Sequence, residues 1–249
     1  MLENRKFQLT LQTQHLKQNA SGYYDWEKKH NTEYWIPNET ALIVCDVWDH
    51  HWSRGANERL SAMLPRMRQT INALRDKEVQ IIHSPSETMN VYEGTPARKR
   101  IIDAPNVELP KSLEHDDPLL PIDDFDGGSD TGEKSWYKAW EKQHAAIEID
   151  QQRDGISDNG VEIYNFFQQK CIQNVLIMGV HTNMCILNRT FAIKQMVRWG
   201  MNVALIRDLT DAMYNPARPP YVSHKEGTEL VIAYIEKFWC PTILSDDLV

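Results

Sequence analysis

The stretch Asn174–Gly200 has the sequence NVLIMGVHTNMCILNRTFAIKQMVRWG and combines an apolar run, a polar turn and a helical pattern. Val175–Val180 is too short for a free-standing helix, so it predicts a buried strand. After the turn, apolar residues recur at helical spacing as far as Gly200, a residue type that often ends helices. Cys185 therefore lies in or just before the first turn of a helix.

This position favours a reactive thiol at Cys185. The unpaired backbone N–H groups and the positive end of the helix dipole stabilise a thiolate there. The same N–H groups could bind a developing oxyanion. The alternative is a buried structural cysteine, so the rest of the chain has to decide between the two interpretations.

Composition is sufficient for one large α/β domain with a full core, since 41% of the 249 residues are hydrophobic. The formal net charge of −8 argues against a nucleic-acid partner. No apolar run reaches the length of a transmembrane helix, so no membrane partner is expected. Residues Met1–Ala20 lack the apolar core of a signal peptide, and the four cysteines show no CxxC spacing. Together these features predict a cytoplasmic protein with reduced thiols.

The order of the elements predicts a doubly wound α/β fold, in which helices cover both faces of a six-stranded, mostly parallel sheet. The predicted strands are Ala41–Asp46, Val79–His83, Ala145–Ile149, Val175–Val180, Asn202–Ile206 and Thr242–Leu244. The predicted helices are Asn57–Met63, one beginning at Pro65, Trp136–Lys142, Gly160–Lys170, one following Cys185, and Glu226–Phe238. Such sheets bind ligands beyond the carboxyl ends of their strands, so Asp46, His83 and His181–Cys185 are expected to share one rim.

Two further segments complete the predicted domain organisation. Residues 1–37 carry scattered aromatic side chains and predict an N-terminal arm laid over the domain or over a partner subunit. Residues 38–249 form the domain, which contains a long acidic insertion at about 84–135. Long ordered loops often act as lids, so we interpret the insertion as a lid or an oligomer contact, with a plain surface insertion as the alternative.

The segments ALIVCD and WDHHW, followed by the stretch quoted first, resemble the isochorismatase-like cysteine hydrolases. This superfamily includes nicotinamidases and N-carbamoylsarcosine amidase. The similarity covers most of Thr40–Leu244, and it is most specific at Asp46 and at the G-V-x-T-N-x-C turn. It implies the isochorismatase-like fold, an Asp–Lys–Cys triad and often a non-proline cis peptide before the cysteine.

By this resemblance Asp46 is the general base and Cys185 the nucleophile. The candidate cis peptide is Val180–His181, and backbone N–H groups near His181 and Cys185 would form the oxyanion hole. Thr182 and Asn183 are expected to brace the turn. His181 itself could act as an acid, a base or a substrate ligand, or it could only hydrogen-bond across the turn.

The lysine of the triad has no counterpart, because the corresponding segment AAIEIDQQRDGISDNG contains none. Arg153 is the only cation there, which makes it the candidate stand-in, although arginine does not lose a proton readily. Trp48 and Trp52 also depart from the family pattern. They are predicted to wall the pocket and stack on a flat substrate, with ordinary packing as the alternative.

Several histidines raise further possibilities. His83 and His224 are candidates for substrate contacts at the rim. Asp49, His51 and His83 have ligand types suited to a divalent metal. Hydrogen-bonded or solvent-facing histidines are the favoured interpretation, so no cofactor is predicted.

The sequence thus predicts a hydrolase that cleaves a C–N bond of a small amide or carbamoyl substrate through a thioester on Cys185. Because the lysine is missing, the alternative is a catalytically silent binding or interaction protein on the same fold. A metal-assisted hydrolase is a third possibility. A small-molecule substrate and a homo-oligomer are the expected partners, the second by resemblance to the family.

Overall fold

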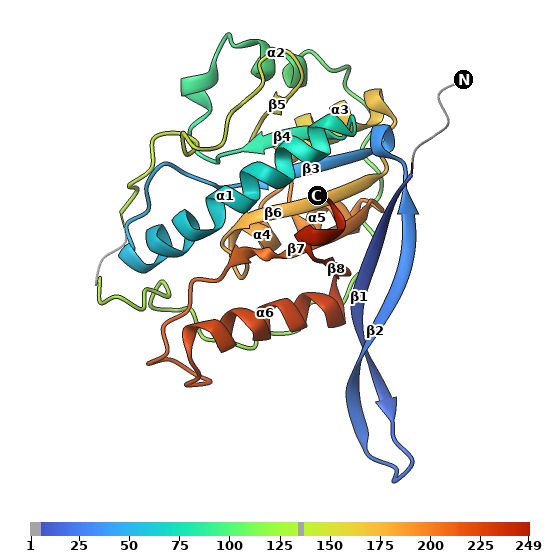
Figure 1. The fold of residues 1–249 in the computed structure, drawn as a ribbon, viewed down its shortest axis with the longest axis vertical. Coiled ribbons are helices and arrows are strands. Elements are labelled where there is room, and N and C mark those ends of the chain that lie inside the picture. The colour runs from blue at the N-terminus through green and yellow to red at the C-terminus, as the bar shows by residue number, and fades with distance from the viewer. Residues whose placement is uncertain (1–5, 134–136) are drawn as a thin grey trace.

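The structure is a computed structural model that describes residues 6–133 and 137–249, and it confirms the predicted α/β fold class (Figure 1). The strands are β1 (Phe7–Gln18), β2 (Tyr24–Trp35), β3 (Thr40–Cys45), β4 (Gln80–Ser84), β5 (Gly155–Ile156), β6 (Asn174–Val180), β7 (Asn202–Asp211) and β8 (Thr242–Ile243). The α-helices are α1 (Arg54–Asp76), α2 (Pro96–Ile102), α3 (Gly160–Lys170), α4 (Cys185–Asn188), α5 (Ile193–Arg198) and α6 (His224–Phe238). The 3₁₀ helices are η1 (Pro37–Glu39), η2 (Met89–Tyr92) and η3 (Ser245–Asp247).

All eight described strands form one sheet in the order β2-β1-β8-β7-β6-β3-β4-β5. The predicted count of six is therefore too low, because residues 7–35 add a hairpin that pairs antiparallel with β8. The strands β3 to β8 pair in parallel. The central strands β3 and β6 are buried along their whole length, as expected for strands covered on both faces.

Two apolar cores lie on the two faces of the sheet. On one face, α3, α5 and α6 contribute buried side chains such as Phe166, Met196 and Ile235. On the other face, α1 contributes Met67 and Ile71. The first half of β1 belongs to this second core, while the hairpin beyond it extends away from the body (Figure 1).

Three predicted elements differ in the structure. Ala145–Ile149 is not a strand, because local turns hold it, with the Ile147 N–H bonded to the His144 carbonyl. The short strand β5 pairs with β4 in its place. The two helices predicted on either side of Pro65 form one continuous helix, α1, whose apolar face is buried at Leu60, Met67 and Ile71.

Two helix predictions also need correction. Residues 137–142 are not helical, and Trp136 of that predicted helix lies outside the described residues. The helix predicted after Cys185 is divided into α4 and α5. The break lies where the start of α3 packs against Thr190. A Cβ on Gly160 would stand 1.8 Å from the Thr190 carbonyl oxygen, so the two backbones touch there.

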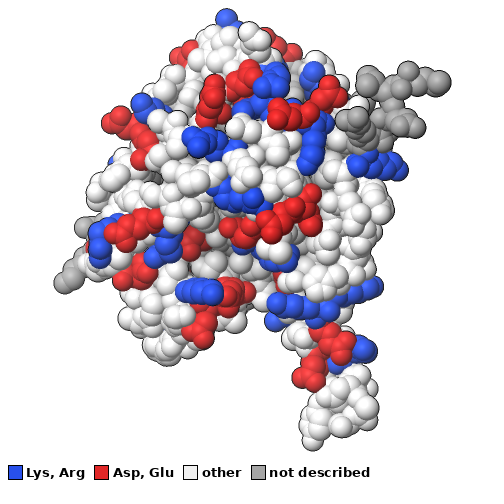
Figure 2. Space-filling view, in the orientation of Figure 1, with Lys and Arg blue, Asp and Glu red and all other residues white. Residues whose placement is uncertain are grey.

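The surface carries charges of both signs. On the face shown in Figure 2, acidic and basic side chains are interspersed, with no large area of one sign. Within the described ranges, no helix is both long and apolar enough to span a membrane.

Candidate active site

The backbone brings the ends of β3 and β6 together at the rim of the sheet. Cys45 is paired with Gly179 in the parallel register of these two strands. Gly179 has φ 126°, and a Cβ there would stand 1.9 Å from the Cys45 carbonyl oxygen. Only glycine fits this approach. The turn that follows β6 therefore delivers Cys185 beside Asp46, the residue after β3.

Asp46 is fully buried and its carboxylate is almost completely engaged. Its backbone has φ 50°, a left-handed conformation that aspartate tolerates better than most residues. One carboxylate oxygen accepts the Ser86 backbone N–H at 2.7 Å, and the other accepts Arg189 Nε at 3.0 Å. The Cys185 side chain also lies close enough to this carboxylate for each group to shift the pKa of the other. The predicted juxtaposition of Asp46 and Cys185 is therefore present.

Arg189, which the sequence reasoning overlooked, is the cation that contacts Asp46. It lies four residues after Cys185, and its N–H donates to the Cys185 carbonyl at 3.1 Å, so a single helical turn places its guanidinium near the thiol. The i,i+4 spacing from the cysteine was the signal that could have revealed it. The prediction that Arg153 replaces the family lysine is wrong. Asp150 holds Arg153 at the surface in a 2.6 Å ion pair.

The electrostatics of this cluster differ from the predicted thiolate. Burial and the neighbouring Asp46 charge raise the pKa of Cys185 well above its ordinary value, while Arg189 opposes this shift. Burial also raises the pKa of Asp46, again against the effect of Arg189. The helix dipole has little effect because α4 has only four residues. At rest the site thus holds a neutral thiol beside Asp46.

The turn before Cys185 is braced from several sides. The Val180–His181 peptide is cis, as predicted. The His181 carbonyl accepts the Met184 and Ile186 N–H groups, and its own N–H faces the Cys185 sulfur. The Thr182 and Thr210 hydroxyls are 2.7 Å apart. The Asn183 amide donates to Asp124 at 2.7 Å and accepts the Met213 N–H at 2.8 Å.

The His181 imidazole does not have the properties of an acid–base catalyst. Burial lowers its pKa to about 3, so the ring is neutral near pH 7. The ring stands edge-on to His51, with 4.8 Å between their centroids. Its contribution to the site thus comes from its backbone.

A pocket of about 400 Å³ opens beside the thiol. It is lined by Leu120, Asp124, Asn183, Met184, Cys185, Asn188 and Arg189. Leu120 and Asp124 belong to the acidic insertion, so that insertion forms one wall of the pocket. Asp124 could not be singled out from the sequence because it is one of many acids there.

The two predicted pocket tryptophans lie behind the nucleophile turn and do not line this pocket. Trp48 stacks on Trp140 with 4.1 Å between ring centroids, and its N–H donates to the Ser86 carbonyl at 3.1 Å. Trp52 belongs to the same buried cluster, against which Met184 and Cys185 pack. Ordinary packing, the alternative for both residues, describes them correctly, since their flat faces are already covered.

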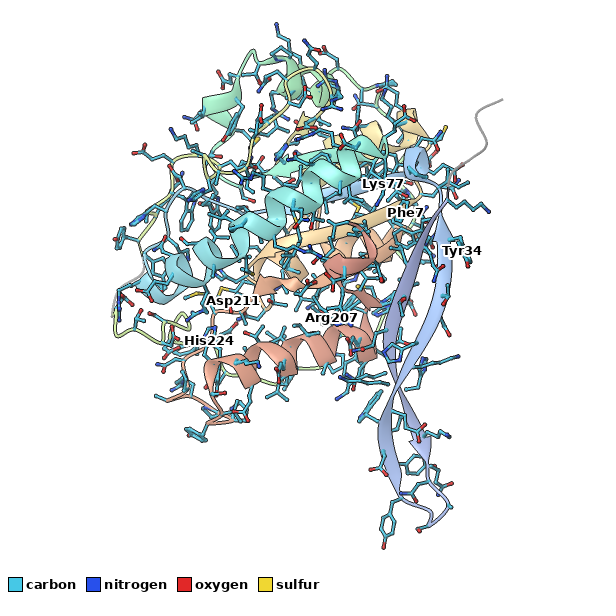
Figure 3. All side chains as sticks on the ribbon, viewed as in Figure 1. Phe7, Tyr34, Lys77, Arg207, Asp211 and His224 are labelled. Atoms are coloured by element: carbon cyan, nitrogen blue, oxygen red, sulfur yellow. The ribbon has the colours of Figure 1, made fainter. Side chains whose placement is uncertain are left out.

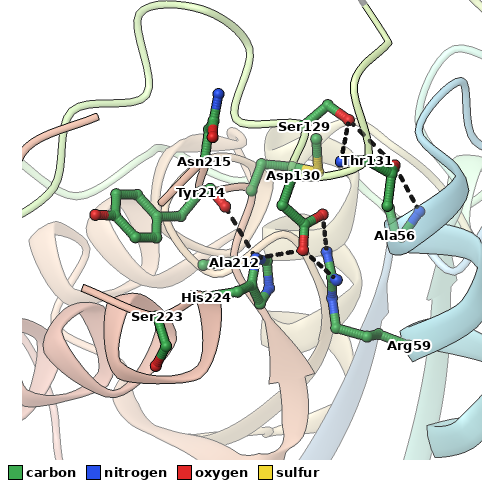
Figure 4. Close-up of polar contacts among 12 residues, drawn as sticks. Ala56, Arg59, Ser129, Asp130, Thr131, Ala212, Tyr214, Asn215, Ser223 and His224 are labelled. Carbon is green, nitrogen blue, oxygen red and sulfur yellow. Dashed lines mark hydrogen bonds and ion pairs between the residues drawn. The ribbon is translucent and has the colours of Figure 1, made fainter. Parts of the chain in front are cut away.

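The remaining histidine candidates are engaged elsewhere. His83 lies 3.0 Å from both Gln143 and Asp154 in the core. His224 contacts Asp130 at 3.4 Å, and Arg59 contacts the same carboxylate (Figure 4). His224 also contacts Asp211 at 3.0 Å, and Arg59 pairs with Asp211 as well. Neither histidine lines the pocket beside Cys185. The predicted substrate contacts of His83 and His224 are therefore absent from this arrangement.

The candidate metal ligands do not converge either. Asp49 accepts the backbone N–H groups of Glu141 and Lys142, while His51 Nδ1 accepts the Ser53 N–H. His83 is bound as described above. Across residues 6–133 and 137–249, no group of three or more His, Cys, Asp or Glu side chains could hold a metal ion.

Comparisons with known proteins agree with this fold. Residues 40–219 match the profile of the isochorismatase domain. A cysteine hydrolase from Pseudomonas syringae pv. phaseolicola 1448A has a similar structure, with a TM-score of 0.51 and 14% identity over 85% of this chain and 91% of that one. An isochorismatase from Pseudomonas putida KT2440 has a TM-score of 0.52 and 10% identity, over 86% of this chain and 91% of that one. A putative isochorismatase from Burkholderia xenovorans LB400 has a TM-score of 0.51 and 13% identity, over 84% of this chain and 85% of that one. At these identities the likeness concerns the fold alone. No curated protein matches the chain.

Proposed function

This chain belongs to the isochorismatase family, and from that premise we propose that it is a hydrolase of small amide or carbamoyl substrates. Cys185 attacks the substrate carbonyl, and a thioester carries the acyl group until water releases it. One observation carries the proposal: the Cys185 thiol and the Arg189 guanidinium both contact the buried Asp46 carboxylate beside an open pocket.

The chemistry follows from the neutral thiol at rest. As the sulfur forms its bond to the carbonyl carbon, Asp46 accepts the thiol proton. Asp46 then returns this proton to the nitrogen as the C–N bond breaks and the amine leaves. In the second half-reaction Asp46 takes a proton from water as the water oxygen bonds to the thioester carbonyl carbon. Asp46 returns this proton to the sulfur as the C–S bond breaks, so the acid product departs and the thiol is restored. Arg189 favours the ionised form of Asp46 between these transfers and does not itself lose a proton.

The backbone around the turn supplies the oxyanion site. The His181 N–H already faces the sulfur, and the Cys185 N–H starts the short helix α4. Donors fixed in this way are aimed at charge that develops only in the transition state, and each is typically worth about 10²–10³ in rate. Thr182 and Asn183 contribute by holding the turn in place.

A substrate screen tests the proposal directly. Small amides and carbamoyl compounds, including nicotinamide, are incubated with the wild type, Cys185→Ala and Cys171→Ala. Cys171 is exposed and serves as the matched control. We expect release of amine or ammonia by the wild type and Cys171→Ala, and an acid-stable acyl adduct on Cys185 in the mass spectrum. Hydrolysis that survives in Cys185→Ala would contradict the thioester route.

A binding protein without catalysis is the second candidate, and one observation favours it. The raised pKa of Cys185 leaves almost no free thiolate near neutral pH. A silent site would give no turnover with any compound in the screen. In addition, Asp46→Asn would leave the affinity for retained compounds unchanged, since no proton transfer is involved. A loss of turnover on Asp46→Asn substitution would exclude this second candidate.

A further inference from the structure

The outer strand of the hairpin, β2, is an open edge. It is the terminal strand of the sheet, and within the described chain it pairs only with β1. Every residue of β2 except Trp35 is exposed. The register with β1 is unbroken from Tyr24 to Trp35, and β2 contains no proline. Bulges and prolines are the usual devices that protect an edge strand from pairing, and β2 uses neither.

The backbone hydrogen-bond pattern shows which groups of β2 are free. At the hairpin turn, the Asn19 N–H donates to the Tyr23 carbonyl at 2.8 Å. Bonded and non-bonded pairs alternate in an antiparallel ladder, so the odd-numbered residues of β2 face β1 with their backbone groups. The even-numbered residues, from Tyr24 to Tyr34, direct their N–H and C=O groups to the open edge.

The protein holds this edge in place and keeps it accessible. Gln12 and Gln14 of β1 donate to the buried Glu236 of α6 at 2.6 and 2.7 Å. The Trp26 ring contacts Phe238 edge-on at 5.7 Å between centroids. These contacts anchor the hairpin along α6, while Tyr34 lies on the outer strand and is 59% exposed (Figure 3). The tip of the hairpin stands clear of the body (Figure 1).

We propose that β2 pairs antiparallel with β2 of a second copy of this chain, about a twofold axis at Asn31. In an antiparallel pairing, two facing residues must be of the same hydrogen-bond type, so both are even-numbered or both are odd-numbered. The twofold axis therefore passes through a residue that faces its own copy. Centring on Glu27, Lys28, Lys29 or Glu33 sets like charges face to face. Centring on His30 places Glu27 against Glu33, and centring on Thr32 pairs no charges at all. The Asn31 centre alone places opposite charges face to face without facing like charges.

In this register Lys29 lies opposite Glu33 of the second copy, and the symmetry repeats this pair. Both residues are odd-numbered, so they occupy non-hydrogen-bonded positions, where facing side chains are closest and charge pairs matter most. The even-numbered pairs, His30 with Thr32 and Lys28 with Tyr34, exchange the free backbone hydrogen bonds. Lysines on an edge usually repel other strands, whereas here Lys29 selects a strand of this same sequence.

Charge reversal tests the register by sedimentation velocity over a range of protein concentrations. We expect a wild-type dimer, and Lys29→Glu should raise its dissociation constant about tenfold or more, since two symmetric pairs change sign. The double variant Lys29→Glu/Glu33→Lys should restore the dimer. Lys17→Glu makes the same charge change on β1, away from the edge, and should leave association unchanged. A wild type that stays monomeric at near-millimolar concentration overturns the proposal, as does a swap that fails to restore the dimer.

Hydrogen exchange provides a second test that needs no substitution. The amides of the even-numbered residues from Tyr24 to Tyr34 point to the open edge, so they should exchange rapidly in dilute protein. Those of Lys28, His30, Thr32 and Tyr34 should become protected as the concentration rises. A dimer that forms without protecting these four amides would show that a different surface associates.

Discussion

Replacing Arg189 by glutamine removes the cation beside Asp46 and should destabilise the protein in a pH-dependent way. Asp46 is completely buried, whereas the Arg189 side chain is 30% exposed. Breaking a buried ion pair by removing one partner costs about 3–5 kcal/mol. Water screens part of this pair, and Asp46 keeps the Ser86 N–H. We therefore expect Arg189→Gln to lower the free energy of unfolding by about 2–3 kcal/mol near pH 7.

The protonation of Asp46 sets an upper limit on this loss of stability and determines how the loss changes with pH. A carboxyl group with an ordinary pKa near 4 can be protonated at pH 7 at a cost of about 4 kcal/mol, so the loss cannot exceed that value. Burial already raises the pKa of Asp46 in the folded state, and losing Arg189 raises it further. A raised carboxyl pKa means that the folded state binds more protons, so stability falls as pH rises through the window between the unfolded and folded pKa values. The difference between Arg189→Gln and wild type should therefore be largest at alkaline pH and shrink on acidification.

Urea unfolding of the two proteins at about pH 8 and about pH 5 measures this difference. Arg153→Gln is the matched control. It removes an arginine whose side chain is 58% exposed and should change stability by less than about 1 kcal/mol. An Arg189→Gln penalty that is absent, or that has the same size at both pH values, would refute the role assigned to the Arg189–Asp46 pair.

Three further predictions concern the site and the frame that holds it. Asp46→Asn removes the negative charge that raises the thiol pKa, so iodoacetamide labelling of Cys185 should shift to lower pH, while turnover of any amide substrate falls about 10²–10⁴-fold. A labelling profile that does not move would contradict the contact between the two side chains. Gly179→Ala should lower the unfolding free energy by at least about 2 kcal/mol in thermal unfolding, because its Cβ meets the Cys45 carbonyl; an unchanged melting temperature would show that β3 and β6 can separate without cost. Although burial opposes it, hydrogen bonds from His83 and Arg75 hold the pKa of Asp154 below its ordinary value, so Asp154→Asn should cost about 3 kcal/mol in urea unfolding. This stability is present above the unfolded pKa and is lost on acidification, so the gap between the two proteins should narrow as the pH falls below about 4, and a gap that stays constant there would exclude the linkage.

The sequence was sufficient for the parts of the fold that depend on long apolar runs and periodic patterns. The runs in β3 and β6 identify central strands, and the helix predicted over Gly160–Lys170 is α3. Local pattern was insufficient where tertiary contacts decide the structure. Ala145–Ile149 has strand-like composition, yet local turns hold it and β5 pairs with β4 in its place. The polar sequence of β2 does not predict a strand. The segment is a strand because its backbone pairs with β1.

The candidate site shows the same division. The sequence by itself determined that a carboxylate and a cysteine end two apolar strands, because strand composition and turn residues are local properties. Only the tertiary structure decided which cation joins them. Arg189 reaches Asp46 because a helical turn and the β3–β6 register converge, while Asp150 holds Arg153 at the surface. The protonation of the thiol was likewise beyond the sequence, since burial and the nearby carboxylate depend on the packing of distant segments, and these outweigh the local effect of a four-residue helix.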